Sequence, residues 1–92
     1  MMLEAVKLAL RIKSNAYDQE ITDLIGAAKR DMLIRGVEVI DESDDLIGEA
    51  IKMYSKANFG NDNPYAEKWK KAYEDLRDSL ALSGHYNVEA IE

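Results

Sequence analysis

Apolar residues recur at spacings of three and four along most of this 92-residue chain, and this helical period constrains the fold more than any other feature. A half-buried strand would instead alternate apolar and polar residues. Residues 37–40 alternate in this way, but over too few positions to predict a strand, although a short extended piece remains possible. We interpret them as a connector in which Val37, Val39 or Ile40 fills the core. The period therefore predicts an all-α fold.

Turn and capping signals divide the period into four helices. The first is short and covers residues 2–12. Ser14 and Asn15 are good N-cap residues and predict the start of a second helix, which Gly36 ends as a left-handed cap. The acidic cluster of residues 41–45 predicts the N-terminus of a third helix that runs to about Asn58. Each boundary combines a cap with a break in the period.

The fourth helix follows the turn of residues 61–64, in which Pro64 suits the first helical position. It runs to Ser83, and Gly84 closes it. We predict a small four-helix bundle with a short first helix, two long helices and a C-terminal tail. The domain covers residues 1–84 and the tail covers residues 85–92, because nothing in this last stretch predicts intramolecular burial.

Two features inside the helices carry further expectations. Trp69 lies on the apolar stripe of the fourth helix, so we assign it to the core. Gly26 and Gly48 lie within helical patterns, where glycine costs about 1 kcal/mol relative to alanine. Close approach of another backbone, at a helix crossing or a subunit contact, would explain them.

The composition excludes several classes of protein. There are no cysteines, which removes disulfides, thiolate catalysis and sulfur-based zinc sites and fits folding in a reducing cytoplasm. No apolar run approaches the roughly 20 residues that cross a bilayer, and the N-terminus has no signal-peptide core. We therefore expect an untargeted protein without a membrane partner.

Catalytic chemistry is also missing from the sequence. The only histidine, His85, follows Gly84 just beyond a helix end, where a solvent-facing imidazole accounts for it better than a catalytic base does. The carboxylates of residues 41–45 lack the spacing of a calcium loop, so helix capping accounts for them. No glycine-rich loop predicts a nucleotide site. We expect no enzyme activity, no metal and no cofactor.

The charge argues against tight DNA binding. Eighteen acidic and twelve basic residues give a formal net charge of −6 and a pI near 4.7, whereas nucleic-acid-binding proteins usually present a basic face. The only basic cluster, Lys68, Lys70 and Lys71, is interleaved with carboxylates at helical spacing. This pattern is typical of a solvated, salt-bridged helix face.

Beyond these patterns, the sequence resembles the phage head-tail connector family, whose members are often called DNA-packaging proteins. The resemblance spans nearly the whole chain. The segments that carry it are Leu8-Ala9-Leu10-Arg11-Ile12, Glu20-Ile21-Thr22-Asp23-Leu24-Ile25, the block from Tyr54 to Pro64 with the following Glu67-Lys68-Trp69, and Leu80-Ala81-Leu82-Ser83-Gly84-His85-Tyr86. Their order and spacing agree with the family throughout.

The resemblance implies a non-enzymatic, all-α subunit of a ring, usually dodecameric, at the head-tail junction of a virion assembled in a bacterial host. Its partners would be copies of itself, the portal protein and a tail-side adaptor or stopper protein. DNA would pass through the ring without specific binding, and an acidic lumen would repel its phosphates.

Residues at the end of the third helix and in the tail are the candidate contacts with the portal or with other copies. They are Tyr54, Asn58, Phe59, Asn63, Pro64, Tyr86, Val88 and Ile91. Tyr54 and Phe59 could equally belong to the core. The alternative function is a small acidic phage-encoded binding protein that mimics DNA or inhibits a host protein. An enzyme subunit or accessory chaperone is disfavoured because no pocket-forming catalytic cluster is present.

Overall fold

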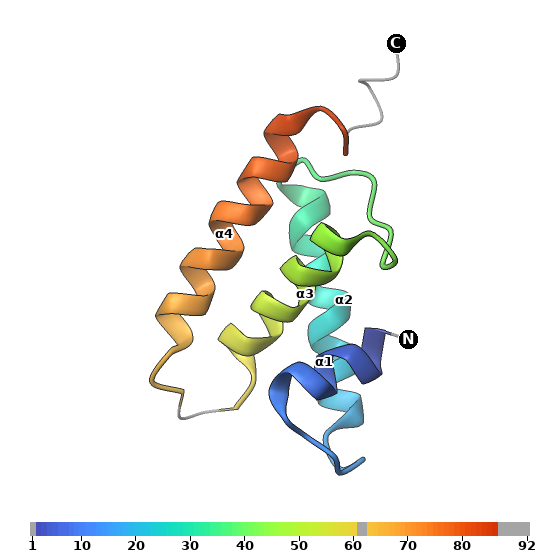
Figure 1. Ribbon diagram of the computed structural model, residues 1–92, viewed down its shortest axis with the longest axis vertical. Coiled ribbons are helices and arrows are strands. Elements are labelled where there is room, and N and C mark those ends of the chain that lie inside the picture. The colour runs from blue at the N-terminus through green and yellow to red at the C-terminus, as the bar shows by residue number, and fades with distance from the viewer. Residues whose placement is uncertain (1, 61–62, 87–92) are drawn as a thin grey trace.

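The computed structural model describes residues 2–60 and 63–86, and all of its regular secondary structure in these ranges is helical. Four helices are present: α1 (Met2–Leu10), α2 (Asp18–Ile34), α3 (Asp45–Asn58) and α4 (Ala66–Ser83). The long helices α2 and α4 run in the same direction, and α3 returns between them, while α1 covers one end (Figure 1). The predicted all-α class is therefore confirmed, with an elongated molecule of 45 × 26 × 18 Å.

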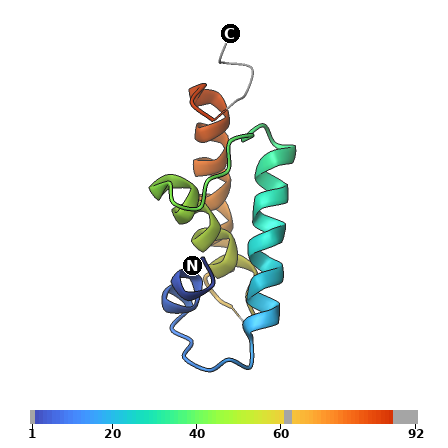
Figure 2. The same cartoon turned by 90° about the vertical axis from the view of Figure 1, so that its right-hand side faces the viewer.

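The start of α2 differs from the prediction. Neither Ser14 nor Asn15 caps this helix, which begins at Asp18 after Tyr17 without any side-chain cap. The Ser14 hydroxyl accepts a hydrogen bond from the Ala16 amide, and the Asn15 side chain accepts one from Lys7. Both polar residues therefore shape the loop between α1 and α2, seen at the lower end of Figure 2. Local hydrogen bonding of this kind competes with capping.

The other helix ends follow the predicted chemistry more closely. Asp44 caps α3, and its carboxylate accepts hydrogen bonds from the Leu46 and Ile47 amides. Gly36 and Gly84 have φ values of 104° and 84°, which confirms the left-handed conformation expected of helix-ending glycines. Pro64 lies in the turn before α4 rather than at its first position, because the helix begins only at Ala66.

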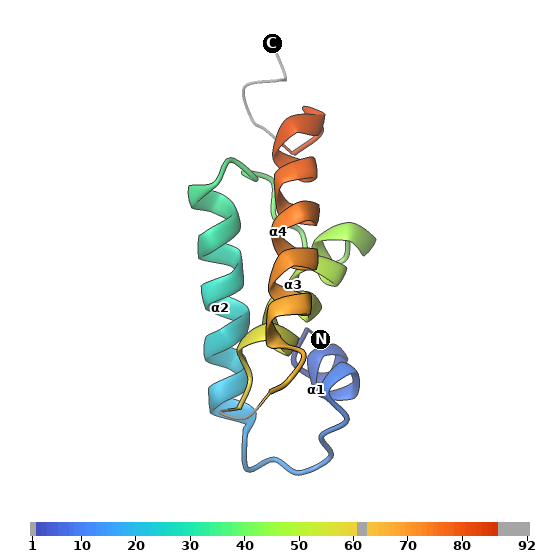
Figure 3. The ribbon, with the colours of Figure 1, turned by 90° about the vertical axis from the view of Figure 1, so that its left-hand side faces the viewer.

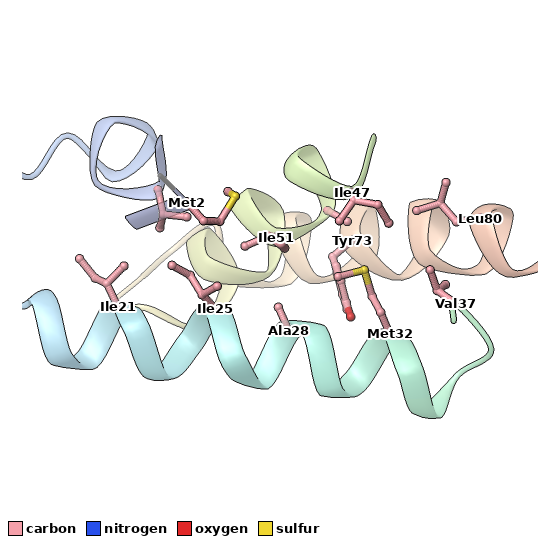
Figure 4. Close-up of a cluster of buried hydrophobic side chains, with 12 residues drawn as sticks. Met2, Ile21, Ile25, Ala28, Met32, Val37, Ile47, Ile51, Tyr73 and Leu80 are labelled. Atoms are coloured by element: carbon pink, nitrogen blue, oxygen red, sulfur yellow. The ribbon is translucent and has the colours of Figure 1, made fainter. Parts of the chain in front are cut away.

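The core lies where α2, α3 and α4 meet, and α1 closes one end of it (Figures 3 and 4). Among the described residues, twelve apolar side chains are buried: Met2, Val6, Ile21, Ile25, Ala28, Met32, Val37, Ile47, Ala50, Ile51, Tyr73 and Leu80. Val37 is the connector residue that fills the core, whereas Ile40 is half-buried and Val39 is 42% exposed. The connector forms no strand.

Trp69 lies outside this buried cluster, so its assignment to the core is wrong. Its ring is half-buried near the start of α4, and the Lys56 ammonium group lies 4.2 Å from the ring centroid. A tryptophan with a cation over its face contributes through cation–π attraction as well as burial. Tyr73, Arg77 and Leu80 are the buried positions of α4 instead.

The two mid-helix glycines differ in their surroundings. A Cβ added at Gly48 would lie 3.8 Å from the Glu42 carbonyl oxygen, which is an ordinary contact. A Cβ added at Gly26 would meet nothing within 4 Å. No helix crossing within the described part of the chain therefore explains Gly26.

Candidate interaction site

The end of α3 contains both residues that pack against the core and residues that are exposed to solvent. Tyr54 and Phe59 are both half-buried against the core. The Tyr54 ring meets the Tyr73 ring edge to face at 5.2 Å, and Phe59 meets Tyr17 in the same geometry at 5.6 Å. Such aromatic pairs stabilise a fold by about 1 kcal/mol beyond their burial. Each ring therefore has an intramolecular packing role.

The turn after α3 is held by Asn63. Its side-chain amide donates to the Lys56 carbonyl at 2.6 Å, and its side-chain oxygen accepts from the Tyr65 amide at 3.0 Å. The Asn58 side-chain amide donates to the Tyr54 carbonyl, yet Asn58 and Pro64 themselves are exposed. Of the five predicted contact residues at the end of α3 and in the turn, these two are therefore the exposed ones.

Tyr86 was predicted to have no intramolecular home, and this prediction is wrong. Its hydroxyl donates to the Asp44 carboxylate at 3.0 Å, and its carbonyl accepts from the amides of Glu38 and Val39. The residue joins the start of α3 and the connector to the chain segment after α4. Sequence periodicity could not reveal these contacts, because the Tyr86–Asp44 bond links residues 42 positions apart and the backbone bonds to Glu38 and Val39 span still more of the chain. Val88 and Ile91 lie outside the described residues.

A charged network that the sequence analysis missed joins α2 to α4. The Tyr73 hydroxyl donates to the Asp31 carboxylate at 2.6 Å, and the Arg77 guanidinium donates to the same oxygen at 3.0 Å. Arg77 also donates to Asp78 at 3.0 Å. One sequence feature could have predicted this network: Arg77 lies on the apolar stripe of α4, where a buried charge without a partner would be costly.

These contacts set the protonation states of the network. Burial acts to raise the pKa of Asp31, but hydrogen bonds from Tyr73 and Arg77 outweigh it and hold this pKa below its ordinary value. Burial and the bond to Asp31 raise the pKa of Tyr73. Burial acts to lower the pKa of Arg77, but its bonds to Asp78 and Asp31 raise it above the ordinary value. The network is therefore a stable ion pair with a neutral phenol.

A groove of about 360 Å³ opens beside this network and is lined by residues of α2, α3 and α4. Tyr54 and Asn58 line it together with charged side chains of both signs, among them Arg35, Lys70 and Glu74. No group of three or more His, Cys, Asp or Glu within the described ranges could hold a metal ion. The groove offers polar contacts and no catalytic cluster.

The chain matches one protein family over nearly its whole length. The model of the family described as phage connector protein matches residues 2–87. The chain belongs to this family. No curated protein and no solved structure matches the chain. Phage connectors are structural components of the virion rather than enzymes. In the described part of this connector, no helix has the length and apolar character to span a bilayer.

Proposed function

We propose that this connector is a head-tail connector subunit that assembles into a ring below the portal, extends the DNA channel and offers the tail its attachment platform. The family match carries the proposal. A tail-side adaptor or stopper protein would bind the opposite end of the ring. Residues 85–92, including Val88 and Ile91, would contribute contacts to these neighbours together with Asn58 and Pro64.

Exposed apolar side chains support an assembling role. Leu8, Ile34 and Leu82 are 76%, 70% and 86% exposed, so each has apolar surface that a neighbouring subunit could remove from water. Such burial would favour assembly. They lie on three different helices, and a ring contact pairs two unlike surfaces of the subunit.

The charge supports a channel that does not hold DNA. A net charge of −6 on each subunit gives a ring a strongly negative potential, and the phosphate backbone is repelled by such a surface. DNA would then slide through without specific binding, which is what passage through a connector requires.

Reconstitution tests the proposal. Purified connector would be added to portal-containing particles of the same phage and examined by electron microscopy, with particles lacking the portal as the control. We expect an added ring at the outer end of the portal and none in the control. Absence of added density under conditions in which both proteins remain folded would refute the function.

A further inference from the structure

The solvent-facing sides of α2 and α4 carry two stripes of residues with identical spacing. Successive members are separated by three, four, three and four residues, so each stripe follows one face of its helix for about 21 Å at 1.5 Å per residue. The α2 stripe consists of Glu20, Asp23, Ala27, Arg30 and Ile34, and the α4 stripe consists of Lys68, Lys71, Asp75, Asp78 and Leu82. All ten residues are exposed.

Each stripe lies opposite the buried face of its own helix. On α2 the buried residues are Ile21, Ile25, Ala28 and Met32, and on α4 they include Tyr73 and Leu80. A step of 100° per residue places the stripes on the far side of each helix from these positions. Because α2 and α4 occupy different sides of the bundle, the stripes belong to two different faces of the molecule (Figure 3).

The chemistry of the two stripes is complementary when both are followed from the N-terminus to the C-terminus. The α2 stripe is acidic, then small, then basic, then apolar. The α4 stripe is basic, then acidic, then apolar. Aligned in the same direction, they give four matched pairs: Glu20 with Lys68, Asp23 with Lys71, Arg30 with Asp78, and Ile34 with Leu82. The fifth position sets the small Ala27 against Asp75, which already pairs with Lys71 at 3.5 Å within the chain. Asp78 likewise already accepts a hydrogen bond from Arg77 at 3.0 Å, so Arg30 would be its second cationic neighbour.

We propose that the α2 stripe of one copy packs against the α4 stripe of the next copy, with the two helices parallel. This contact rests on the proposed function, since it supplies the subunit interface of the ring. The two helices already point the same way within one chain (Figure 1). Rotation about an axis along them keeps them parallel between copies and forms the unlike contact that closes a ring.

Gly26 fits the same contact. It lies beside the α2 stripe, it is exposed, and no atom lies within 4 Å of an added Cβ. Together with Ala27 it leaves a low surface in the middle of the helix, where a neighbouring helix approaches most closely. The glycine that the isolated chain does not need therefore has a role in the interface.

The stripes fit a contact between unlike faces of two copies, α2 against α4, better than a twofold contact that would pair each α2 stripe with itself. Two α2 stripes in parallel would oppose like charges at every charged position, which is unfavourable. Two α2 stripes in antiparallel would pair Asp23 with Arg30 but would set the apolar Ile34 against Glu20. Only the α2–α4 pairing covers Ile34 and Leu82 with each other.

Cysteine crosslinking tests the contact directly, because the chain has no cysteine of its own. One chain carries Ile34→Cys and a second, distinguishable in mass, carries Leu82→Cys. After mixing and mild oxidation at high protein concentration, the contact predicts more heterodimer than the sum of both homodimers, which is what random collision would give. The control mixes Leu8→Cys with Leu82→Cys, two exposed positions that the contact does not bring together. Heterodimer at or below the level of the control would overturn the proposal.

Charge reversal provides an independent test. One variant carries Glu20→Lys with Asp23→Lys, and the other carries Lys68→Glu with Lys71→Glu. Each alone sets like charges against each other at every contact, so we expect loss of self-association in sedimentation velocity. Mixed in equal amounts, they can alternate so that every contact is complementary, and association should return. Asp45→Lys with Glu49→Lys, on α3 and away from both stripes, is the matched control for the first variant.

The reconstituted portal separates this inference from the proposed function. Loss of the added ring with either reversed variant, and its return with the mixture, would support both. A ring that forms equally well with a single reversed variant would overturn the α2–α4 contact while leaving the connector function intact. If the wild-type protein never docks, yet the Ile34→Cys and Leu82→Cys chains crosslink to each other, the function would be refuted and the contact retained.

Discussion

Arg77 occupies a position of α4 that the helical period assigns to the core, and only 8% of the residue is exposed. The charge is tolerated because Asp31 and Asp78 accept its hydrogen bonds and the Tyr73 ring lies 5.5 Å away. Without a cation, the half-buried Asp31 carboxylate would keep only the Tyr73 hydroxyl as a close donor. The pair therefore joins α2 to α4 at a specific register.

Replacing Arg77 with Met, which keeps the aliphatic stem, should lower the free energy of unfolding by about 1–3 kcal/mol, because a partly buried carboxylate loses its charged partner. Urea denaturation would measure this change. Arg35→Ala is the control, since the Arg35 guanidinium is 4.0 Å from Asp31 and its side chain is 60% exposed. A surface substitution of this kind should change stability by less than about 0.5 kcal/mol. Equal effects of the two variants would contradict the buried-network reading.

Acid should weaken the same network. The folded-state pKa of Asp31 lies below its ordinary value, so the carboxylate stabilises the fold above the unfolded-state pKa of about 3.9 and this contribution disappears as the pH falls through the folded pKa. The stability difference between the wild type and Asp31→Asn should therefore be largest near neutral pH and shrink below about pH 4. Urea titrations from pH 6 to pH 3 would show this. A difference that stays constant over that range would be inconsistent with a depressed Asp31 pKa.

At the scale of elements, Asp44 connects two ends of the chain. It caps α3 through the Leu46 and Ile47 amides and accepts the Tyr86 hydroxyl. Asp44→Ala should cost about 1–2 kcal/mol through loss of the cap. Tyr86→Phe should cost less, because the cap remains. Thermal unfolding would rank these two variants.

Truncation tests the role of Tyr86 in the same experiment. A chain that stops after residue 85 lacks Tyr86, and a chain that stops after residue 87 keeps it. We expect the chain without Tyr86 to melt at a lower temperature, and identical melting would show that Tyr86 does not anchor the segment after α4.

Gly26→Ala should separate stability from assembly. The added Cβ meets nothing in the isolated chain, and alanine favours the helix by about 1 kcal/mol, which corresponds to a rise of about 4–8 °C in Tm for a domain of this size. The same methyl group would obstruct a neighbouring helix at the α2 stripe, so self-association should weaken. Calorimetry and sedimentation would measure the two effects. A variant that is more stable and assembles as well as the wild type would place Gly26 outside the interface.

The sequence predicted the helices better than their ends. Period and glycine caps depend on neighbouring residues, so the four helices and the left-handed Gly36 and Gly84 follow from local pattern. The start of α2 was wrong because Ser14 and Asn15 bond within the preceding loop. The Tyr86 contacts and the Asp31–Arg77 pair join residues far apart in the chain, and their partners cannot be read from periodicity. Several contacts of the candidate site also join different helices, so periodicity within one helix could not predict them.

At the scale of the whole molecule, the direction of the helices decides how a ring is built. The α2 and α4 stripes run along the long dimension of the molecule, which measures 45 Å against 26 and 18 Å across. If these stripes form the subunit contact, the long dimension lies along the ring axis. One end of the bundle then faces the portal and the other faces the tail.

This orientation predicts the height of the ring that electron microscopy should find below the portal. The connector layer should extend the channel by close to 45 Å, the length of one molecule, because each subunit stands upright beside its neighbours. Helices that lay flat in the plane of the ring would instead give a layer closer to 26 Å, the next largest dimension. A reconstruction of connector-decorated portals would distinguish the two heights, and undecorated portals imaged in parallel would define the baseline. A thin layer would exclude parallel α2–α4 contacts along the ring axis.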